Sequence, residues 1–197
     1  MIVWINGAFG AGKTQTAFEL HRRLPGSFVY DPENVGYFIR RNLPKELAGG
    51  DFQHFPMWRE MNYHMLAYLN REHKGVLLVP MTVVDTGYFD EMAGRLRREG
   101  ADVRHFALCA SRETLLKRLR SRREGPDSWA AQQIDRCVKG LAHEAFRHHL
   151  DTEHHTVRDN VEAIASLAGL ELQPDNRGPW RRRADRLLTT LKHIRLK

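Results

Sequence analysis

Apolar and polar positions in this chain alternate between short runs typical of buried strands and longer segments with helical spacing. The first run, residues 1–5, is apolar throughout, as expected for a strand buried on both faces of a parallel sheet. Thr14 to Leu24 follows with helical spacing and places Ala17, Leu20 and Leu24 on one side. The other predicted strands are residues 27–30, 76–79, 103–110 and 154–157, and the other predicted helices are residues 33–41, 56–73, 89–99, 113–123, 128–149 and 160–167.

This alternation predicts an α/β domain in which a parallel sheet is flanked by helices and joined by right-handed crossovers. In such sheets, ligands bind beyond the carboxyl ends of the strands. The rule brings four segments to one rim: the turn after residue 5, Asp31, the segment after Val84 and the residues around Ser111. We expect the domain to span residues 1–173 and to be followed by a linker and a final helix over residues 174–197.

The net charge of +7 is concentrated near one end of the chain. Residues 177–197 contain eight Lys or Arg and one acid, Asp185, whereas the acids and bases of the other residues balance. The basic character therefore describes this segment and not the domain. Cys109 and Cys137 provide neither a disulfide framework nor metal-ligand spacing, which favours a reducing, cytoplasmic location.

The turn between the first strand and the first helix reads Gly7-Ala8-Phe9-Gly10-Ala11-Gly12-Lys13-Thr14. It is a complete phosphate-binding loop in the context that the motif requires. Glycines let backbone N–H groups turn toward phosphate oxygens, and the helix N-terminus adds the positive end of its dipole. We expect residues 7–14 to bind the phosphates of ATP, Lys13 to reach the β- and γ-phosphates, and the Thr14 hydroxyl to ligate Mg²⁺.

The third predicted strand ends without the aspartate that assists Mg²⁺ binding in many P-loop NTPases. Asp85 comes late, after Val83 and Val84. Metal binding is therefore expected to depend on Thr14, the phosphates and water, with Asp31 nearby. The missing aspartate disfavours a motor ATPase more than it disfavours a small-molecule kinase.

Asp31 follows the second predicted strand, beside the phosphate-binding loop. A carboxylate there can orient an acceptor hydroxyl and take its proton, and Glu33 is the second candidate for this role. The alternative is that Asp31 is an ordinary turn residue before Pro32.

The helix predicted over residues 113–123 is rich in basic residues. Arg118 and Arg122 are four residues apart and share a face, which would clamp the transferring phosphoryl group in a lid-like segment, residues 112–136. Arg136 is expected to complete the substrate site. The alternative for this helix is a solvated face whose arginines pair with Glu113 and Glu124.

These features together resemble small P-loop kinases of the nucleotide, gluconate and antibiotic phosphotransferase type. More specifically, Trp4-Ile5-Asn6 with the loop, Tyr30-Asp31-Pro32-Glu33, and Gln133-Ile134-Asp135-Arg136-Cys137 resemble the tunicamycin-resistance (TmrB-like) ATP-binding proteins, over about residues 1–170. The resemblance implies a P-loop NTPase fold of the nucleotide-kinase type. It also implies an ATP-dependent cytoplasmic enzyme that confers resistance to tunicamycin, a uracil-containing nucleoside antibiotic with a fatty acyl chain.

Residues 37–75 form the segment that closes over the acceptor in kinases of this fold. The first 32 of them are rich in aromatic residues, which suit a planar base or an acyl chain better than a polyanionic sugar phosphate. Met57, Met61 and Met65 recur at helical spacing and are expected to belong to the core. The expected substrate-binding residues are Asp31, Glu33, Tyr37, Phe52, Phe55, Trp58 and Arg136.

The last segment predicts a basic amphipathic helix. Its apolar positions are Trp180, Ala184, Leu187, Leu188, Leu191 and Ile194, and its basic positions are Arg181, Arg182, Arg183, Arg186, Lys192, Arg195 and Lys197. Such a helix favours an anionic membrane surface, with docking of the apolar face on the domain as the main alternative. Nucleic acid ranks third, because no aromatic residues interleave with the basic ones.

The sequence thus predicts a kinase that inactivates tunicamycin by transferring the γ-phosphoryl group of ATP to one of its hydroxyls. In this hypothesis Lys13, Asp31, Arg118 and Arg122 are the catalytic residues. Two alternatives remain: a nucleoside or sugar kinase of metabolism, and a membrane-associated protein that sequesters tunicamycin without modifying it.

Overall fold

The computed structural model describes the backbone of residues 1–193 and the side chains of residues 1–190. The strands form one parallel sheet with the order β2-β3-β1-β4-β5. They are β1 (Ile2–Gly7), β2 (Phe28–Val29), β3 (Leu77–Pro80), β4 (Val103–Cys109) and β5 (His149–Asp151). The predicted tail positions Leu191, Lys192, Ile194, Arg195 and Lys197 lie outside the described side chains.

Helices connect the strands in the order that a parallel sheet requires. They are α1 (Lys13–Arg23), α2 (Glu33–Arg41), α3 (Pro56–Glu72), α4 (Thr86–Phe89), a π-helical turn η2 (Asp90–Gly94), α5 (Arg95–Arg98), α6 (Arg112–Ser121), α7 (Trp129–Gln132), α8 (Ile134–Leu141), α9 (Val157–Ala168) and α10 (Pro179–His193). Two 3₁₀ turns, η1 (Phe52–His54) and η3 (Glu144–Phe146), precede α3 and β5.

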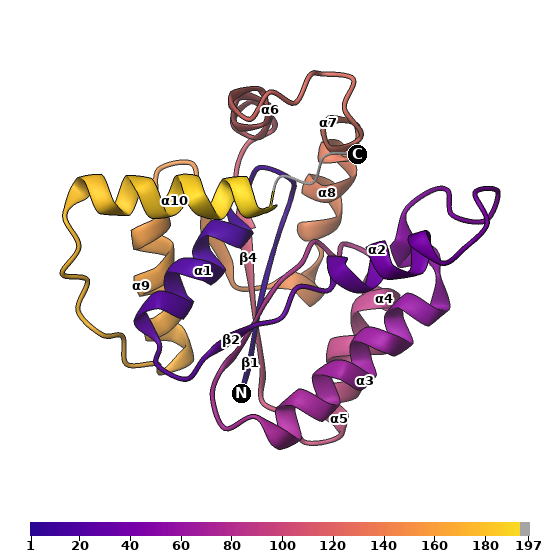
Figure 1. Cartoon of the computed structure of the whole chain (residues 1–197), viewed down its shortest axis with the longest axis horizontal. Helices are drawn as coiled ribbons and strands as arrows, with labels where there is room; N and C mark the ends of the chain where they lie inside the picture. Colours follow the sequence, from indigo (N-terminus) through magenta and orange to yellow (C-terminus); the bar gives the residue numbers. More distant parts are fainter. Residues whose placement is uncertain (194–197) are drawn as a thin grey trace.

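The sheet separates two apolar cores, and the central strand β1 contributes to both. Ile2 and Trp4 belong to one core, whereas Val3 and Ile5 belong to the other. In Figure 1, α3, α4 and α5 cover one face of the sheet, α1 and α9 cover the opposite face, and α6 and α7 project beyond the sheet. The predicted α/β fold with a parallel sheet flanked by helices is confirmed.

Two predicted elements near the end of the domain are wrong. The helix expected over residues 128–149 is broken into α7 and α8 and ends at Leu141. The strand expected at residues 154–157 lies five residues earlier, because Thr156 and Asp159 form a capping box that begins α9. β5 is an edge strand of three residues in which Leu150 pairs with Leu108. It is too short to show an alternating apolar pattern in the sequence.

The methionine stripe of α3 faces solvent, which corrects the expectation that it belongs to the core. Met57, Met61 and Met65 are exposed, and the buried face of α3 carries Trp58 and Leu66 instead. Both faces of this helix hold apolar residues at helical spacing. Periodicity alone therefore did not show which face packs on the sheet.

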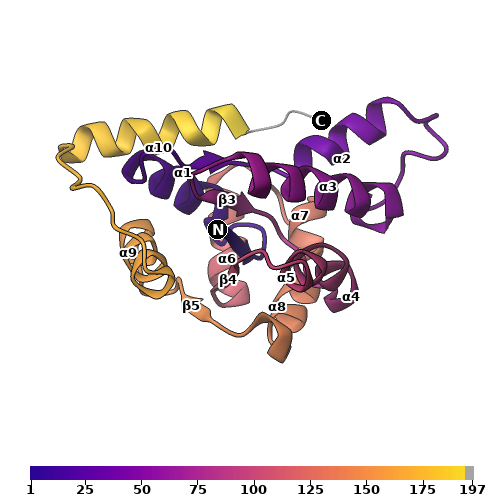
Figure 2. The same ribbon diagram turned by 90° about the horizontal axis from the view of Figure 1, so that it is seen from below.

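The helix α10 lies along the outer side of α1 (Figure 2). It docks through polar groups: the Gln15 amide donates to the Arg186 carbonyl at 2.9 Å and to the Thr190 hydroxyl at 2.8 Å. The alternative in which its apolar face docks on the domain is wrong, because Trp180 is 83% exposed and Leu187 is 60% exposed. No helix within residues 1–193 is long and apolar enough to cross a membrane.

Candidate functional site

The phosphate-binding loop links the end of β1 to the start of α1 in the geometry that its glycines allow. Gly10 (φ +84°) and Gly12 (φ +99°) adopt left-handed conformations, which glycine tolerates at little cost. Gly10 also lies against α6, where a Cβ atom would approach the Leu115 carbonyl oxygen to 3.1 Å. The phosphate-binding loop is therefore packed between α1 and the lid-like segment.

The N-terminus of α1 differs from those of three other helices. Ser111, Ser128 and Thr156 cap α6, α7 and α9 by accepting a backbone N–H, whereas no described side chain caps α1. The first N–H groups of a helix need an acceptor. This helix end suits an anion, and the Thr14 hydroxyl in the same turn fits a Mg²⁺ ion bound to that anion.

Lys13 lies at the centre of the site. Its ammonium group donates to the Ala8 carbonyl at 3.0 Å and lies 5.5 Å from the centre of the Phe9 ring. Burial lowers the pKa of Lys13 from 10.5 to about 8; the charges of Glu33, Cys137 and Asp31 oppose this shift, and Arg122 adds to it. These groups therefore act on the Lys13 ammonium through their charges.

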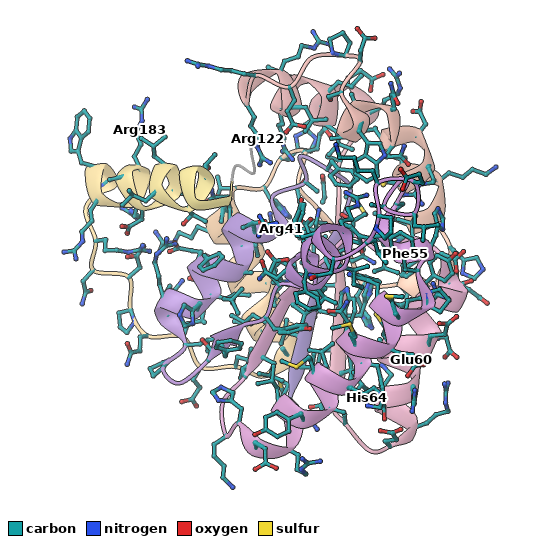
Figure 3. All side chains as sticks on the ribbon, turned by 45° about the vertical axis from the view of Figure 1, so that its right-hand side comes forward. Arg41, Phe55, Glu60, His64, Arg122 and Arg183 are labelled. Atoms are coloured by element: carbon teal, nitrogen blue, oxygen red, sulfur yellow. The ribbon has the colours of Figure 1, made fainter. Side chains whose placement is uncertain are left out.

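The two arginines predicted to act as a clamp lie in different surroundings. The Arg118 guanidinium donates to the hydroxyl, at 3.0 Å, and to the carbonyl of Thr152, in the connection between β5 and α9. Arg122 follows α6 and extends toward the centre of the molecule (Figure 3), where its charge acts on Lys13. Of the predicted pair, Arg122 acts on Lys13 through its charge, whereas Arg118 bonds Thr152 in the β5–α9 connection.

The lid-like segment also contacts the phosphate-binding loop through aromatic rings. Phe9 packs edge-to-face on Trp129 of α7, with ring centroids 5.1 Å apart. One face of the Phe9 side chain thus meets the lid-like segment and another meets Lys13.

Asp31 occupies a tight turn between β2 and α2. Its Oδ1 atom accepts a hydrogen bond from the backbone N–H of Glu33 at 3.0 Å. The carboxylate therefore also stabilises the turn, which is the role expected of an ordinary turn residue before Pro32. The indole N–H of Trp58 donates to the Pro32 carbonyl at 3.0 Å. The turn is therefore fixed at both of the residues that follow Asp31.

The aromatic residues expected to bind substrate are packed more tightly than the sequence indicated. Trp58 has no exposed surface and Phe52 is 8% exposed, whereas Phe55 and Tyr37 are half-buried. The Phe52 ring lies against Trp58, with centroids 5.4 Å apart, and against the open face of Gly36. Trp58 therefore supports the turn beyond Asp31 and presents no surface to a substrate in this conformation.

Arg136 reaches the acceptor-closing segment through an ion pair. Its guanidinium lies 3.1 Å from the carboxylate of Asp51, which is almost fully buried and also accepts from the backbone N–H of Gln53. Sequence reasoning missed Asp51. Its only signal is an Asp directly before the first residue of an aromatic run, which is also typical of an ordinary cap.

No aspartate directly follows β3, since residues 81–84 are Met-Thr-Val-Val, and other side chains hold the loop at this rim. The Thr82 hydroxyl donates to the Gly7 carbonyl at 2.7 Å, and the Asn6 side chain bonds both the N–H and the carbonyl of Val83. Asp85 accepts from the backbone N–H of Tyr88 and caps α4. Within the described part of the chain, no group of three or more His, Cys, Asp or Glu is placed to hold a metal.

Comparisons with known proteins agree with this architecture. A family model described as an AAA domain matches residues 2–143. The structure of the Deinococcus radiodurans tunicamycin resistance protein is similar, with 36% sequence identity, a TM-score of 0.75, and coverage of 88% of this chain and 99% of that chain. No curated protein sequence matches the chain.

Two more distant structures share the fold. A gluconokinase from Sinorhizobium meliloti is 14% identical with a TM-score of 0.59, covering 85% of this chain and 93% of that one. A shikimate kinase from Bacteroides thetaiotaomicron is 18% identical with a TM-score of 0.57, covering 86% and 99%. The chain belongs to the AAA domain family of P-loop proteins, among the tunicamycin-resistance proteins with a P-loop kinase fold.

Proposed function

We propose that this protein is an ATP-dependent kinase that transfers the γ-phosphoryl group to a hydroxyl of tunicamycin. One observation carries the proposal: the uncapped N-terminus of α1, with Lys13 in its first turn, lies at the same rim of the parallel sheet as the Asp31 carboxylate, which the Glu33 N–H holds in place. A phosphate site alone would serve hydrolysis equally well. Carboxylates beside that site supply what an acceptor hydroxyl needs, and the similarity to a tunicamycin resistance protein, at 36% identity, supports the choice of acceptor.

Each residue then has a distinct task. The first N–H groups of α1 and Lys13 hold the β- and γ-phosphates, and Arg122 neutralises charge that spreads over the transferring group. The acceptor oxygen forms a bond to the γ-phosphorus while the bond to the β-phosphate oxygen breaks. The hydroxyl proton passes to Asp31, and ADP leaves. Mg²⁺, held by the phosphates and the Thr14 hydroxyl, supplies further charge neutralisation when it is bound.

Asp31 is a better candidate for the base than Glu33. The hydrogen bond from the Glu33 N–H to Oδ1 restricts rotation of the Asp31 carboxylate, which is the preorganisation that proton transfer requires. Glu33, at the start of α2, lies near enough to Lys13 to be its main attractive charge. We assign Glu33 to charge balance around the phosphates.

Mass spectrometry tests the proposal directly. Tunicamycin incubated with purified protein, Mg²⁺ and ATP should gain one phosphoryl group (about 80 Da) with the wild type and not with Lys13→Ala. An unmodified drug that the protein retains only with ATP would replace the kinase by a sequestering protein. Transfer to nucleosides or sugars but not to tunicamycin would indicate a metabolic kinase.

We also propose that α10 attaches the protein to an anionic membrane surface. Because α10 docks on α1 by its polar side, the apolar residues Trp180, Leu187 and Leu188 face solvent. Arg181, Arg183 and Arg186 are also exposed, and Arg183 points away from the domain in Figure 3. An outward apolar strip flanked by arginines suits a lipid surface with negative headgroups.

Co-sedimentation with vesicles tests this attachment. Wild-type protein should sediment with phosphatidylglycerol vesicles, less so at high salt, and a Leu187→Ser, Leu188→Ser variant should remain in solution. Leu47→Ser with Leu167→Ser is the matched control, because both leucines are similarly exposed outside α10. Equal sedimentation of all three proteins would refute the attachment through α10.

A further inference from the structure

A buried chain of hydrogen bonds connects α3 to the turn that holds Asp31. The Tyr30 hydroxyl donates to the Asn62 side-chain carbonyl at 2.8 Å, and the Asn62 amide donates to the Trp58 carbonyl at 2.8 Å. The Trp58 indole N–H completes the chain by donating to the Pro32 carbonyl at 3.0 Å. The chain thus bonds the residue before Asp31 and the residue after it.

This region needs such support because its backbone provides little. β2 has only two residues, and its last pairing with β3 is the hydrogen bond from the Tyr30 N–H to the Leu78 carbonyl at 3.0 Å. Pro32 has no N–H to extend the ladder. Beyond Tyr30, the position of the turn is therefore set by side chains and not by strand pairing.

The groups in the chain are polar, although an apolar core would fill the same space. Trp58 and Asn62 have no exposed surface, and Tyr30 is almost fully buried. Buried polar groups must keep their partners, and hydrogen bonds are directional, so this arrangement admits one placement of the turn. Burial, with the charge of Asp31 as a second cause, raises the pKa of Tyr30, so its hydroxyl remains a donor throughout the physiological range.

We propose that Trp58 and Asn62 are positioning residues that hold the Asp31 carboxylate where it meets the acceptor hydroxyl. This inference rests on the proposed kinase activity, in which Asp31 takes the proton. Trp58 does not touch the substrate; it acts through Pro32. Small displacements of a reacting group are costly in rate, since a shift of about 1 Å can lower it about 10²-fold.

The first test is Trp58→Phe, which keeps an aromatic ring in the core and removes the N–H that Pro32 accepts from. We expect kcat for acceptor phosphorylation to fall about 10-fold, with the ATP dissociation constant unchanged within about twofold. The matched control is Trp4→Phe. Trp4 is equally buried, and its N–H makes a longer hydrogen bond, 3.4 Å, to the Met81 carbonyl. The control should lower stability without lowering kcat of the folded protein.

Two further variants separate positioning from general loss of structure. Tyr30→Phe removes the hydroxyl at the other end of the hydrogen-bond chain and should also lower kcat. It replaces Trp58→Phe as the test if that variant does not fold. In an Asp31→Asn background, Trp58→Phe should cause no further fall in kcat, because the group that it positions is gone. If the fold-decreases in kcat caused by Asp31→Asn and by Trp58→Phe multiply in the double variant, the inference is overturned.

A measurement independent of turnover keeps this inference distinct from the proposed function. The ¹³C carboxyl signal of Asp31, assigned by its loss in Asp31→Asn, should change its chemical shift and titration in Trp58→Phe but not in Trp4→Phe. An unchanged signal together with an unchanged kcat refutes positioning by Trp58. Absence of any phosphoryl transfer by the wild type refutes the proposed function, whatever the carboxyl signal does.

Discussion

On the phosphate side of the site, eight consecutive residues, 7–14, provide the loop, the helix end and the lysine. On the acceptor side, the residues that flank Asp31 are bonded to Trp58 and Asn62 of α3, and Phe52 packs on Gly36. The first half is therefore local in sequence and built mainly from backbone, whereas the second is assembled from segments about 30 residues apart. A substitution on the phosphate side should remove nucleotide binding, and one on the acceptor side should spare it.

Loss of the Lys13 side chain should have the largest effect. We expect Lys13→Ala to lower phosphoryl transfer by at least about 10³-fold, because the ammonium group faces the charge that develops on the phosphates. ATP binding, measured by calorimetry, should weaken with it. A variant that keeps wild-type transfer would show that this loop does not hold the reacting nucleotide.

Removal of the charge on Asp31 should separate the two halves. Asp31→Asn should lower kcat about 10²- to 10³-fold, the range of general base catalysis, while the ATP dissociation constant changes less than about threefold. Glu33→Gln is the companion variant, and its main effect should fall on ATP binding. The assignment of Asp31 as the base would be reversed if Glu33→Gln had the larger effect on kcat.

The packing under the acceptor side should be sensitive to a single methyl group. In Gly36→Ala the new Cβ atom would lie 2.6 Å from the Phe52 ring. Overpacking of this kind costs about 1–3 kcal/mol of unfolding free energy, measurable by urea titration. Gly49→Ala is the control, since a Cβ there meets no atom within 4 Å, and its stability should change by less than about 0.5 kcal/mol. ATP affinity should be unaffected in both.

The pH dependence of ATP binding should report Lys13. Its pKa is about 8 without nucleotide, and bound polyphosphate favours the ammonium form, which raises that pKa. Above pH 8 binding must therefore take up a proton, and the ATP dissociation constant should rise by up to about tenfold per pH unit. Calorimetry between pH 6.5 and 9.5 measures this slope. Lys13→Gln should lack it, and a wild-type affinity that is flat above pH 8 would contradict the role of Lys13.

The sequence predicted the conformation of the loop over residues 7–14 because each requirement of this conformation is local. Gly10 and Gly12 occupy left-handed positions, and Lys13 begins α1, as the motif requires. The alternation of apolar runs also predicted the sheet and its flanking helices. It failed at β5, a three-residue edge strand whose pairing with β4 depends on long-range contacts and not on periodicity.

The sequence by itself thus determined the P-loop fold, the loop over residues 7–14 at the start of α1 and a carboxylate at the end of β2, because strand periodicity and glycine conformation are properties of adjacent residues. Only the tertiary structure decided which face of α3 is buried, which of the two arginines bonds the β5–α9 connection and which side of α10 docks on α1. In each of these cases the sequence offered two nearly equal faces or partners. The choice between them is made by packing and hydrogen bonding with residues far along the chain.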